Sequence, residues 1–556
     1  MLRYRSAGGS LTHMRAKTVK STATVFTEAM RAYEDGKPAD ARRLARQLVE
    51  SAPSFGGAHY LLGLLALDQG QGKRAAGHLA TAIAITPGQS ALHLAMGRAL
   101  EMGNEVAEAS LHFRTVLNIH PHHAEAHARL GHLLRQQGRV DEAISHCRHA
   151  VTADPGHAEA WNTLGALLQQ QGDPREAAQC LRRALQLRPV WPTALNNFGL
   201  ALKECGNLAE AAAILEGAVD IRPDHAGTRT NLASVLRAMG QLDRAREQAE
   251  KAVKLAPRDS DSWVELGLIR QAQGHEDGAA SAFDRATAIA PDQIKPWFCL
   301  AESCRAIGQT DRAAQAYRHC LTLDPDDSHG AGLGLALTGS ADTPQRAPQA
   351  YVRQLFDEYA DRFDSALVGA LDYRGPALLA DALNRCLDER RDLAVLDAGC
   401  GTGLAAPVLR PLAATLDGLD LSPAMVAKAR DRGIYDSLHE AELEQFLSRR
   451  RVEYDLIAAA DVMVYLGDLT PVLNAARGAL RDDGILAFTV EKAENCDSYM
   501  LGAKHRYAHA ADYIRRQADF AGFTVALLED AVTRKDGGVD VPGMVAVLRK
   551  QSRKGD

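Results

Sequence analysis

The sequence lacks long apolar runs, is poor in aromatic residues and contains no paired cysteine motif. No hydrophobic stretch approaches the roughly 18 residues that a membrane-spanning helix needs, so we expect a soluble protein. The nine cysteines are odd in number and form no CxxC pair. This favours reduced thiols and a cytoplasmic location over a disulfide framework or a zinc knuckle. Aromatic residues make up only 5% of the chain, a composition that favours close-packed helices over β-sandwiches.

The sequence also lacks a strong charge of either sign. Its 64 Lys and Arg residues face 70 Asp and Glu residues, which gives a net charge of −6. Nucleic acids and anionic lipids require a basic surface, so we expect neither a nucleic acid nor a membrane as a partner. Residues 1–21 are basic without an apolar core, which predicts a flexible tail rather than a signal peptide. A length of 556 residues predicts at least two domains.

A 34-residue period runs through the first part of the chain. Proline recurs at this spacing from Pro53 to Pro325, and nine such units cover residues 22–327. The eighth position of every unit is glycine or alanine, and the twentieth is always alanine. Two antiparallel helices approach closely where their crossing residues are small, and proline ends the second helix. The pattern predicts nine helix pairs stacked into an all-α solenoid.

These units resemble the tetratricopeptide repeat family. The likeness is closest where Trp161 and Trp263 open their units and Gly165 and Gly267 stand at the eighth position. The resemblance implies a concave groove that binds a peptide or a partner protein.

Two groups of polar residues in the repeats suggest ligand binding. Asn162, Asn197 and Asn231 lie about one repeat apart and could hydrogen-bond a peptide backbone, or they could be solvated helix residues. His123 and His127 have the i, i+4 spacing of metal ligands. His127, however, occupies the position that tryptophan fills in other units, so we interpret it as a packing residue and predict no metal site.

The period ends after Pro325, and the character of the chain changes. Small, polar and proline-containing sequence predicts a linker over residues 328–350. Over residues 351–550, β-rich runs alternate with helical ones, which predicts an α/β domain with a parallel sheet. The last two β-rich runs flank a glycine turn and predict an antiparallel hairpin. Residues 551–556 form a short tail.

A glycine-rich motif, DAGCGTG, runs from Asp397 to Gly403 between the first predicted strand and its helix. Glycine lets backbone amides at a helix N-terminus approach a ligand. Leu404 stands where the dinucleotide-binding pattern GxGxxG requires glycine, which disfavours a nicotinamide cofactor. Asp420, at the end of the second predicted strand, is placed to hold ribose hydroxyls. Alternatively, it is only an acidic residue before the helix that starts near Ser422.

The DAGCGTG motif, the GLDLS segment around Asp420 and the closing hairpin together resemble the seven-stranded, class I S-adenosylmethionine-dependent methyltransferases. More narrowly, residues 351–367, 459–469 and 505–514 resemble a bacterial group of methyltransferases that carry tetratricopeptide repeats. The resemblance implies an N-terminal repeat solenoid and a C-terminal Rossmann-like α/β domain that ends in an antiparallel hairpin. It also implies S-adenosylmethionine as the cofactor.

The resemblance assigns roles to individual residues. The glycine loop would line the methionine moiety and Asp420 would bind the ribose. Leu421 and Met425 would contact the adenine face, and Glu442 would accept from the adenine amino group. The Ala460 carbonyl would bind the cofactor ammonium. The predicted cofactor-binding residues are Asp397, Gly399, Cys400, Gly401, Gly403, Asp420, Leu421, Met425, Glu442 and Ala460.

Methyl transfer needs an in-line arrangement of acceptor and methyl group, and a base only where the acceptor carries a proton. His505, Tyr507 and Tyr465 are predicted near the carboxyl ends of strands, where ligands of open sheets bind. They are candidates for substrate contact or for the base, or they are core residues. Tyr359 and Phe363 could cover the cofactor or form the apolar stripe of their helix.

The sequence thus predicts an S-adenosylmethionine-dependent methyltransferase whose repeats bind a protein partner or the acceptor. The alternative is a repeat scaffold whose methyltransferase-like domain is catalytically silent.

Overall fold

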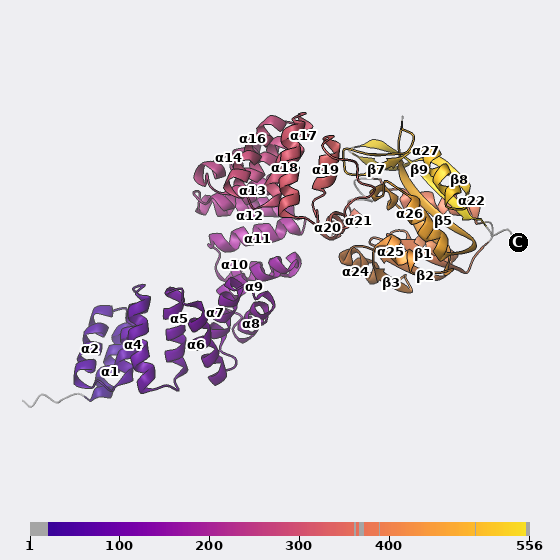
Figure 1. Cartoon of the computed structure of the whole chain (residues 1–556). Helices are drawn as coiled ribbons and strands as arrows, with labels where there is room; N and C mark the ends of the chain where they lie inside the picture. Colours follow the sequence, from indigo (N-terminus) through magenta and orange to yellow (C-terminus); the bar gives the residue numbers. More distant parts are fainter. Residues whose placement is uncertain are drawn as a thin grey trace, which may run out of the picture. The chain divides into compact units, whose positions relative to one another are not determined.

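The computed structural model describes residues 21–360, 363–365, 372–387, 390–494, 496–536 and 538–551. The chain forms two compact units, which divide between Leu255 and Ala256. Figure 1 shows the helices of the first part of the chain and the sheet of the last part. The predicted tails lie outside the described residues, except for Ser21 and Gln551. Among the described helices, none has the length and hydropathy needed to cross a bilayer.

The first unit consists, in its described part, of helices that pair in chain order. They are α1 (Thr22–Glu34), α2 (Pro38–Ser51), α3 (Gly56–Leu67), α4 (Gly72–Ile85), α5 (Ser90–Met102), α6 (Val106–Ile119), α7 (Ala124–Gln136), α8 (Val140–Ala153), α9 (Ala158–Gln171), α10 (Pro174–Leu187), α11 (Pro192–Glu204), α12 (Leu208–Ile221), α13 (Ala226–Ala238) and α14 (Leu242–Leu255). The predicted solenoid is confirmed.

Close contact between the two helices of a repeat explains the small residue at the eighth position. A Cβ atom added to Gly199 would lie 2.5 Å from Cγ of Leu215, which is completely buried on the second helix. In the first repeat, alanine replaces both residues: Ala29 occupies the position of Gly199, and Ala45 occupies the position of Leu215. The sizes of the two residues therefore compensate for each other. The same glycine contact recurs at Gly63–Leu79, Gly97–Phe113, Gly131–Cys147, Gly165–Leu181 and Gly267–Phe283.

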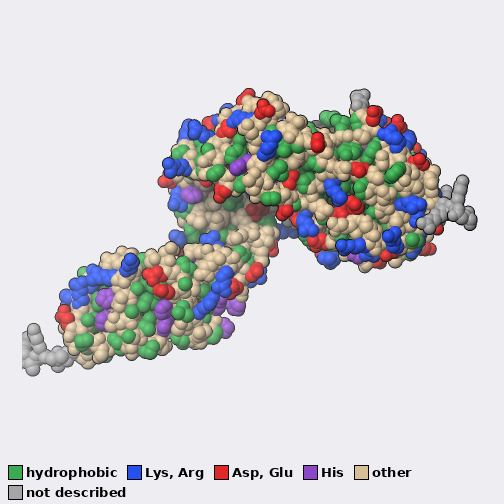
Figure 2. Space-filling model, viewed as in Figure 1, with side chains coloured by type: hydrophobic (Ala, Val, Ile, Leu, Met, Phe, Trp, Pro, Cys, Tyr) green, Lys and Arg blue, Asp and Glu red, His purple; other side chains and the backbone are tan. Residues whose placement is uncertain are grey.

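Histidines of the first unit pair within their repeats. Nδ1 of His127 lies 2.8 Å from Nδ1 of His146, and Nε2 of His127 lies 2.9 Å from the Pro121 carbonyl oxygen. His93 and His112 form an equivalent pair at 2.9 Å. Figure 2 shows histidine side chains gathered on the surface of this unit. Among the described residues, no group of three or more His, Cys, Asp or Glu side chains could hold a metal ion.

The predicted asparagines lie side by side in neighbouring repeats. Nδ2 of Asn197 donates to Oδ1 of Asn162 at 3.3 Å, and Nδ2 of Asn231 donates to Oδ1 of Asn196 at 2.9 Å. The amides thus form two separate side-chain pairs, of which the second includes Asn196 in place of Asn197, and their peptide-binding role stays a prediction.

The second unit begins with two further repeats, formed by α15 (Ser260–Ala272), α16 (Glu276–Ile289), α17 (Ile294–Ala306) and α18 (Thr310–Leu323). The segment predicted as a linker, residues 328–350, contains ordered structure. It contains α19 (Ala331–Leu337), whose first N–H groups are capped by Asp327. Further on, the Ala347 N–H donates to the Tyr465 carbonyl at 2.9 Å. Backbone hydrogen bonds to distant residues order this polar segment.

The sheet domain follows, with α20 (Gln349–Tyr359), α21 (Phe363–Ser365) and α22 (Gly375–Cys386) before its first strand. Its strands are β1 (Leu393–Ala398), β2 (Ala413–Asp420), β3 (Ser437–Glu440), β4 (Tyr454–Ala459), β5 (Leu480–Lys492), β6 (Tyr499–Leu501), β7 (Tyr507–His509), β8 (Phe523–Asp536) and β9 (Val539–Lys550). Between them lie α23 (Ala406–Leu409), η2 (Arg410–Leu412), α24 (Pro423–Asp431), α25 (Leu443–Ser448), η3 (Met463–Tyr465), α26 (Thr470–Ala479) and α27 (Ala511–Phe520).

The strands are parallel in the order β3-β2-β1-β4-β5, and β9 then pairs antiparallel with β5 and with β8. Strand β7 pairs with the end of β5 and β6 pairs with β7. Alternate side chains face opposite layers, so that Val395 and Leu456 pack on one face while Leu396 and Ile457 pack on the other. The predicted parallel sheet with a terminal antiparallel hairpin is confirmed.

Candidate functional site

A cavity of about 410 Å³ opens beside the carboxyl ends of β1, β2 and β4, and α20 and α21 supply its opposite wall. Ligands of open parallel sheets bind at this edge, because the loops that follow the strands meet there. Its lining includes Tyr351, Tyr359, Phe363, Tyr373, Asp397, Gly399, Cys400, Gly401, Asp420, Leu421, Glu442, Ala460, Asp461, Tyr465, Lys504 and Arg506.

The glycine loop after β1 brings bare backbone to the cavity. Gly399 and Gly401 have φ values of +71° and +54°, which favour glycine. A Cβ atom on Gly399 would lie 2.2 Å from Cγ2 of Val462. The Gly399 N–H donates to the Leu419 carbonyl at 2.7 Å. Gly403 has a φ of +88° but does not line the cavity. The loop is therefore tied to β2 and leaves room for a ligand against its backbone.

Asp420 connects the end of β2 to this loop. One carboxylate oxygen accepts from the Gly401 N–H at 2.8 Å, and the other accepts from the Ser422 N–H at 2.9 Å. Burial raises the pKa of Asp420, while these backbone N–H groups lower it. The helix cap itself is Ser422, whose Oγ accepts from the Met425 N–H at 3.1 Å. Asp420 thus lines the cavity and is not the helix cap, and its contact with ribose hydroxyls stays a prediction.

Asp397, at the end of β1, is a second buried carboxyl at the cavity wall. Only 1% of it is exposed, and the Tyr435 hydroxyl donates to its Oδ2 at 2.6 Å. Burial raises the pKa of Asp397 to about 7, although the Tyr435 hydrogen bond opposes that rise. A cationic group bound nearby would favour the ionised form of this carboxyl.

The residues predicted for adenine and ammonium binding are only partly brought together. Leu421, Glu442 and Ala460 line the cavity. Met425 does not; it is fully buried in α24, and its contact with the adenine face stays a prediction. Glu442 also caps α25, since its carboxylate accepts from the Gln445 N–H at 2.7 Å.

Helix α20 closes the cavity from the side opposite the sheet. Asp357 accepts a hydrogen bond from the Ser422 hydroxyl, which ties α20 to the start of α24. Tyr359 and Phe363 both line the cavity, and their rings meet edge to face at 6.0 Å between centroids. Of the two interpretations of this aromatic pair, the structure favours the cover over the cavity.

A group of four charged residues lies at the far end of the cavity, beyond β4. The Asp461 carboxylate accepts hydrogen bonds from Nη1 of Arg506 at 3.1 Å and from Nη1 of Arg534 at 3.3 Å. Arg534 also binds Glu491, and Nη2 of Arg506 lies 3.3 Å from the hydroxyl oxygen of Tyr465. Tyr465 therefore lies at the predicted place. The two arginines were not predicted, because nothing in the sequence around them distinguishes them from surface arginines.

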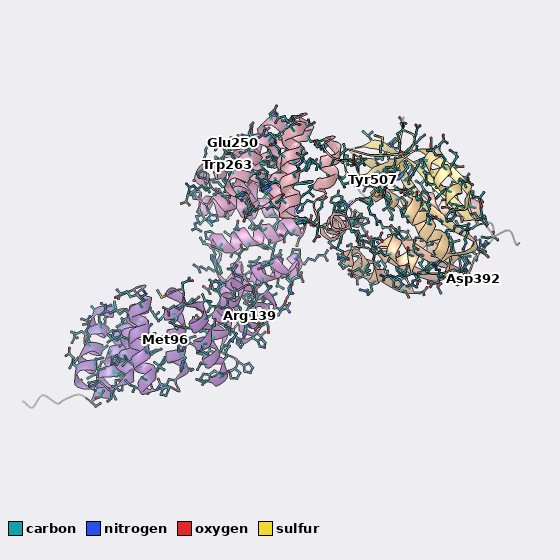
Figure 3. The ribbon with its side chains drawn as sticks, in the orientation of Figure 1. Met96, Arg139, Glu250, Trp263, Asp392 and Tyr507 are labelled. Carbon is teal, nitrogen blue, oxygen red and sulfur yellow. The ribbon has the colours of Figure 1, made fainter. Side chains whose placement is uncertain are left out.

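The other two acceptor-site candidates do not line the cavity, and their role stays a prediction. Tyr507, labelled in Figure 3, is fully buried and donates to the Pro344 carbonyl at 2.7 Å. His505 packs edge to face on Phe298 and Tyr351, with ring centroids 6.3 Å and 6.0 Å away. Both side chains contact neighbouring segments, and neither is among the described residues that line the cavity.

Comparison with known proteins agrees with this architecture. Residues 371–527 match a methyltransferase domain family. Tetratricopeptide repeat families match residues 26–90, 66–133, 123–189, 162–226, 204–266 and 298–331. The chain carries tetratricopeptide repeats and a methyltransferase domain.

Several curated relatives match a small part of the chain. A malonyl-[acyl-carrier protein] O-methyltransferase from Acetivibrio thermocellus is 32% identical over 105 residues, which are 18% of this chain and 37% of the relative. Methyltransferase-like protein 27 from Homo sapiens is 39% identical over 92 residues, which are 16% of this chain and 37% of the relative. The chain spans 37% to 56% of the length of the first three relatives.

Among solved structures, the Cut9-Hcn1 hetero-tetramer of APC/C aligns with a TM-score of 0.38 and 19% sequence identity. The alignment covers 50% of this chain and 55% of that chain.

Proposed function

We propose that the chain is an S-adenosylmethionine-dependent methyltransferase whose repeats bind a protein partner or the acceptor. The observation that carries this proposal is the hydrogen bond between Gly401 and Asp420, which places the bare glycine loop and a carboxylate on one cavity wall. A nucleoside joined to an amino acid needs both features, since the carboxylate can hold the ribose and the loop can accommodate the amino-acid end.

The cavity residues fit such a cofactor. Asp420 would bind the ribose hydroxyls, and the Gly399–Gly401 backbone would lie along the methionine moiety. Asp397 and the Ala460 carbonyl would attract the ammonium group, and Leu421 and Glu442 would face the adenine. When bound, S-adenosylmethionine supplies an electrophilic methyl group. The chain's own contribution is to align the acceptor with that group and to exclude water, and alignment alone can lower the barrier by about 7 to 11 kcal/mol.

The acids around the cavity favour an acceptor that is already deprotonated. Asp461 is held by two arginines, Asp420 by two backbone N–H groups and Glu442 by the Gln445 N–H. Asp397 accepts from Tyr435, and the cofactor ammonium proposed beside it would lower its pKa and make it a weaker base. Burial raises the pKa of Tyr465, so its phenol is a poor base. Among the described lining residues there is no histidine. A carboxylate acceptor needs no base, and we propose that class. The malonyl group in the names of four relatives also ends in a carboxylate.

Transfer of a labelled methyl group tests the activity and the acceptor class together. The full chain is incubated with tritiated S-adenosylmethionine and lysate from a strain that lacks the protein, and the products are separated by size. We expect label transfer that Asp420→Asn reduces at least tenfold, since the ribose contact would lose its charge. Mild alkali should release the label as volatile methanol if a methyl ester has formed.

Each result has a clear consequence. Label that is stable to alkali would contradict the carboxylate class but not the methyltransferase. Absence of transfer, together with intact binding of the cofactor, would favour the scaffold alternative. Label in protein rather than small molecules would support acceptor recruitment by the repeats.

A further inference from the structure

The turn between β6 and β7 connects the last repeat to the cavity. It spans residues 502–506 and is tight, since the Gly502 N–H donates to the Arg506 carbonyl at 2.7 Å and the His505 N–H donates to the Gly502 carbonyl at 3.0 Å. His505 has a φ of +60°, a conformation that residues other than glycine rarely adopt. Such a backbone persists where neighbouring contacts fix it.

Helix α17 of the last repeat supplies those contacts. Phe298 lies against the His505 ring, and Oε1 of Glu302 lies 3.7 Å from its Nε2. One turn further along the helix, Nη2 of Arg305 donates to the Ala503 carbonyl at 3.3 Å. Three successive turns of α17 thus face one short turn of the sheet domain, and all of these residues lie in the second unit.

The α17 side chains are themselves held in place. Arg305 and Glu302 form an ion pair at 2.7 Å, and the Tyr317 hydroxyl donates to Glu302. Tyr317 is fully buried, and a Cβ atom on Gly334 would lie 2.3 Å from its ring carbon Cζ. Packing of α18 against α19 therefore fixes the carboxylate that faces His505.

The opposite end of the turn reaches the cavity. Arg506 follows His505 directly and binds Asp461 and Tyr465, both of which line the cavity. The Arg506 side chain is 23% exposed and pairs with Asp461 at 3.1 Å, so a shift of the turn would break a partly buried ion pair. Lys504 of the same turn also lines the cavity.

We propose that Glu302 and Arg305 of the last repeat are positioning residues of the methyltransferase site, which act by holding the 502–506 turn so that Arg506 reaches Asp461 and Tyr465. The last repeat is then a structural part of the site, whatever the other repeats bind. The expected effect on turnover rests on the proposed function, whereas the claim about the position of the turn does not.

Hydrogen exchange tests the claim about the turn. In the full chain, Arg305→Gln and Glu302→Gln are compared with Arg318→Gln, which removes an exposed charge from α18. We expect amides in a peptide covering residues 499–509 to exchange at least fivefold faster in the first two variants and at an unchanged rate in the third. Unchanged exchange in Arg305→Gln and Glu302→Gln would overturn the proposal.

A double-mutant cycle tests whether the effect passes through Arg506. Arg305→Gln should lower the turnover of labelled methyl transfer about five- to tenfold with less than a twofold change in the cofactor KM, as expected for the loss of one ordinary hydrogen bond. In an Arg506→Gln background it should have no further effect. Equal losses in both backgrounds would overturn the route through Arg506. A wild-type chain without methyl transfer would contradict the proposed function, and hydrogen exchange would still decide the claim about the turn.

Discussion

Replacing Gly199 by alanine tests how the two helices of a repeat pack. Its effect on stability should change sign with the size of the residue at position 215, which lies opposite on the second helix. In the wild type, the new Cβ would lie 2.5, 2.8 and 3.1 Å from Cγ, Cδ2 and Cδ1 of Leu215. Cγ is a branch carbon of a completely buried side chain, so it cannot swing away as the end of a flexible chain could. Either the two helices must separate or Leu215 must leave its rotamer.

The magnitude follows from two opposing effects. Alanine is favoured over glycine in a helix interior by about 1 kcal/mol, whereas overpacking a tight core costs about 1 to 3 kcal/mol. We expect a net loss of up to about 2 kcal/mol for Gly199→Ala, or up to roughly 4 °C in the thermal midpoint. Leu215→Ala removes the clashing atoms, so in that background Gly199→Ala should stabilise by about 1 kcal/mol.

Thermal unfolding of the full chain, followed by far-ultraviolet circular dichroism, measures both effects. Gly217→Ala is the matched control, because it lies in α12 of the same repeat and nothing lies within 4 Å of its added Cβ. It should raise the midpoint in both backgrounds. If Gly199→Ala destabilised equally with leucine or alanine at position 215, size compensation between the helices would be refuted.

Three further predictions concern charge. Burial raises the pKa of Asp397 to about 7, so between about pH 4 and 7 the folded state holds a proton that the unfolded state releases. The free energy of unfolding should therefore fall as the pH rises from about 4 to 7. Asp397→Asn should flatten this slope in urea titrations. Burial lowers the pKa of His146 to about 4, so the unfolded chain takes up a proton at a higher pH than the folded chain does. The free energy of unfolding should therefore fall by roughly 2 kcal/mol, after a discount for solvent screening, as the pH falls from 6.5 towards 4. His146→Gln should remove that acid sensitivity. Arg534→Met leaves Asp461 and Glu491 without one of their cations and should cost about 3 to 5 kcal/mol in urea unfolding, against a smaller loss for Arg534→Lys.

The repeats were predictable because their structure is local. Each unit carries its own proline, turn and small crossing residue, so a 34-residue period read from the sequence corresponds to one packed helix pair. The segment before α20 was not predictable in the same way. Its order comes from distant partners, such as the Tyr465 carbonyl that accepts from the Ala347 N–H, and its small polar composition resembles that of a solvated linker.

The candidate site likewise has a part that the sequence predicts and a part that depends on residues far apart in the chain. The glycine loop and Asp420 follow two neighbouring parallel strands, so their meeting at one sheet edge follows from topology. Arg506 reaches Asp461 from 45 residues away, and no local pattern announces that pair. His505 and Tyr507 were placed at the right edge, but strand and turn geometry directs their side chains toward α17 and Pro344.

Isothermal titration of the full chain with S-adenosylmethionine tests the central claim most directly. The glycine loop and Asp420 should give saturable binding in the micromolar range, which Asp420→Ala abolishes and Asp519→Ala, the loss of an exposed carboxylate on α27, leaves unchanged. Absence of binding heat in the wild type, or equal affinity in Asp420→Ala, would contradict a cofactor site at this cavity.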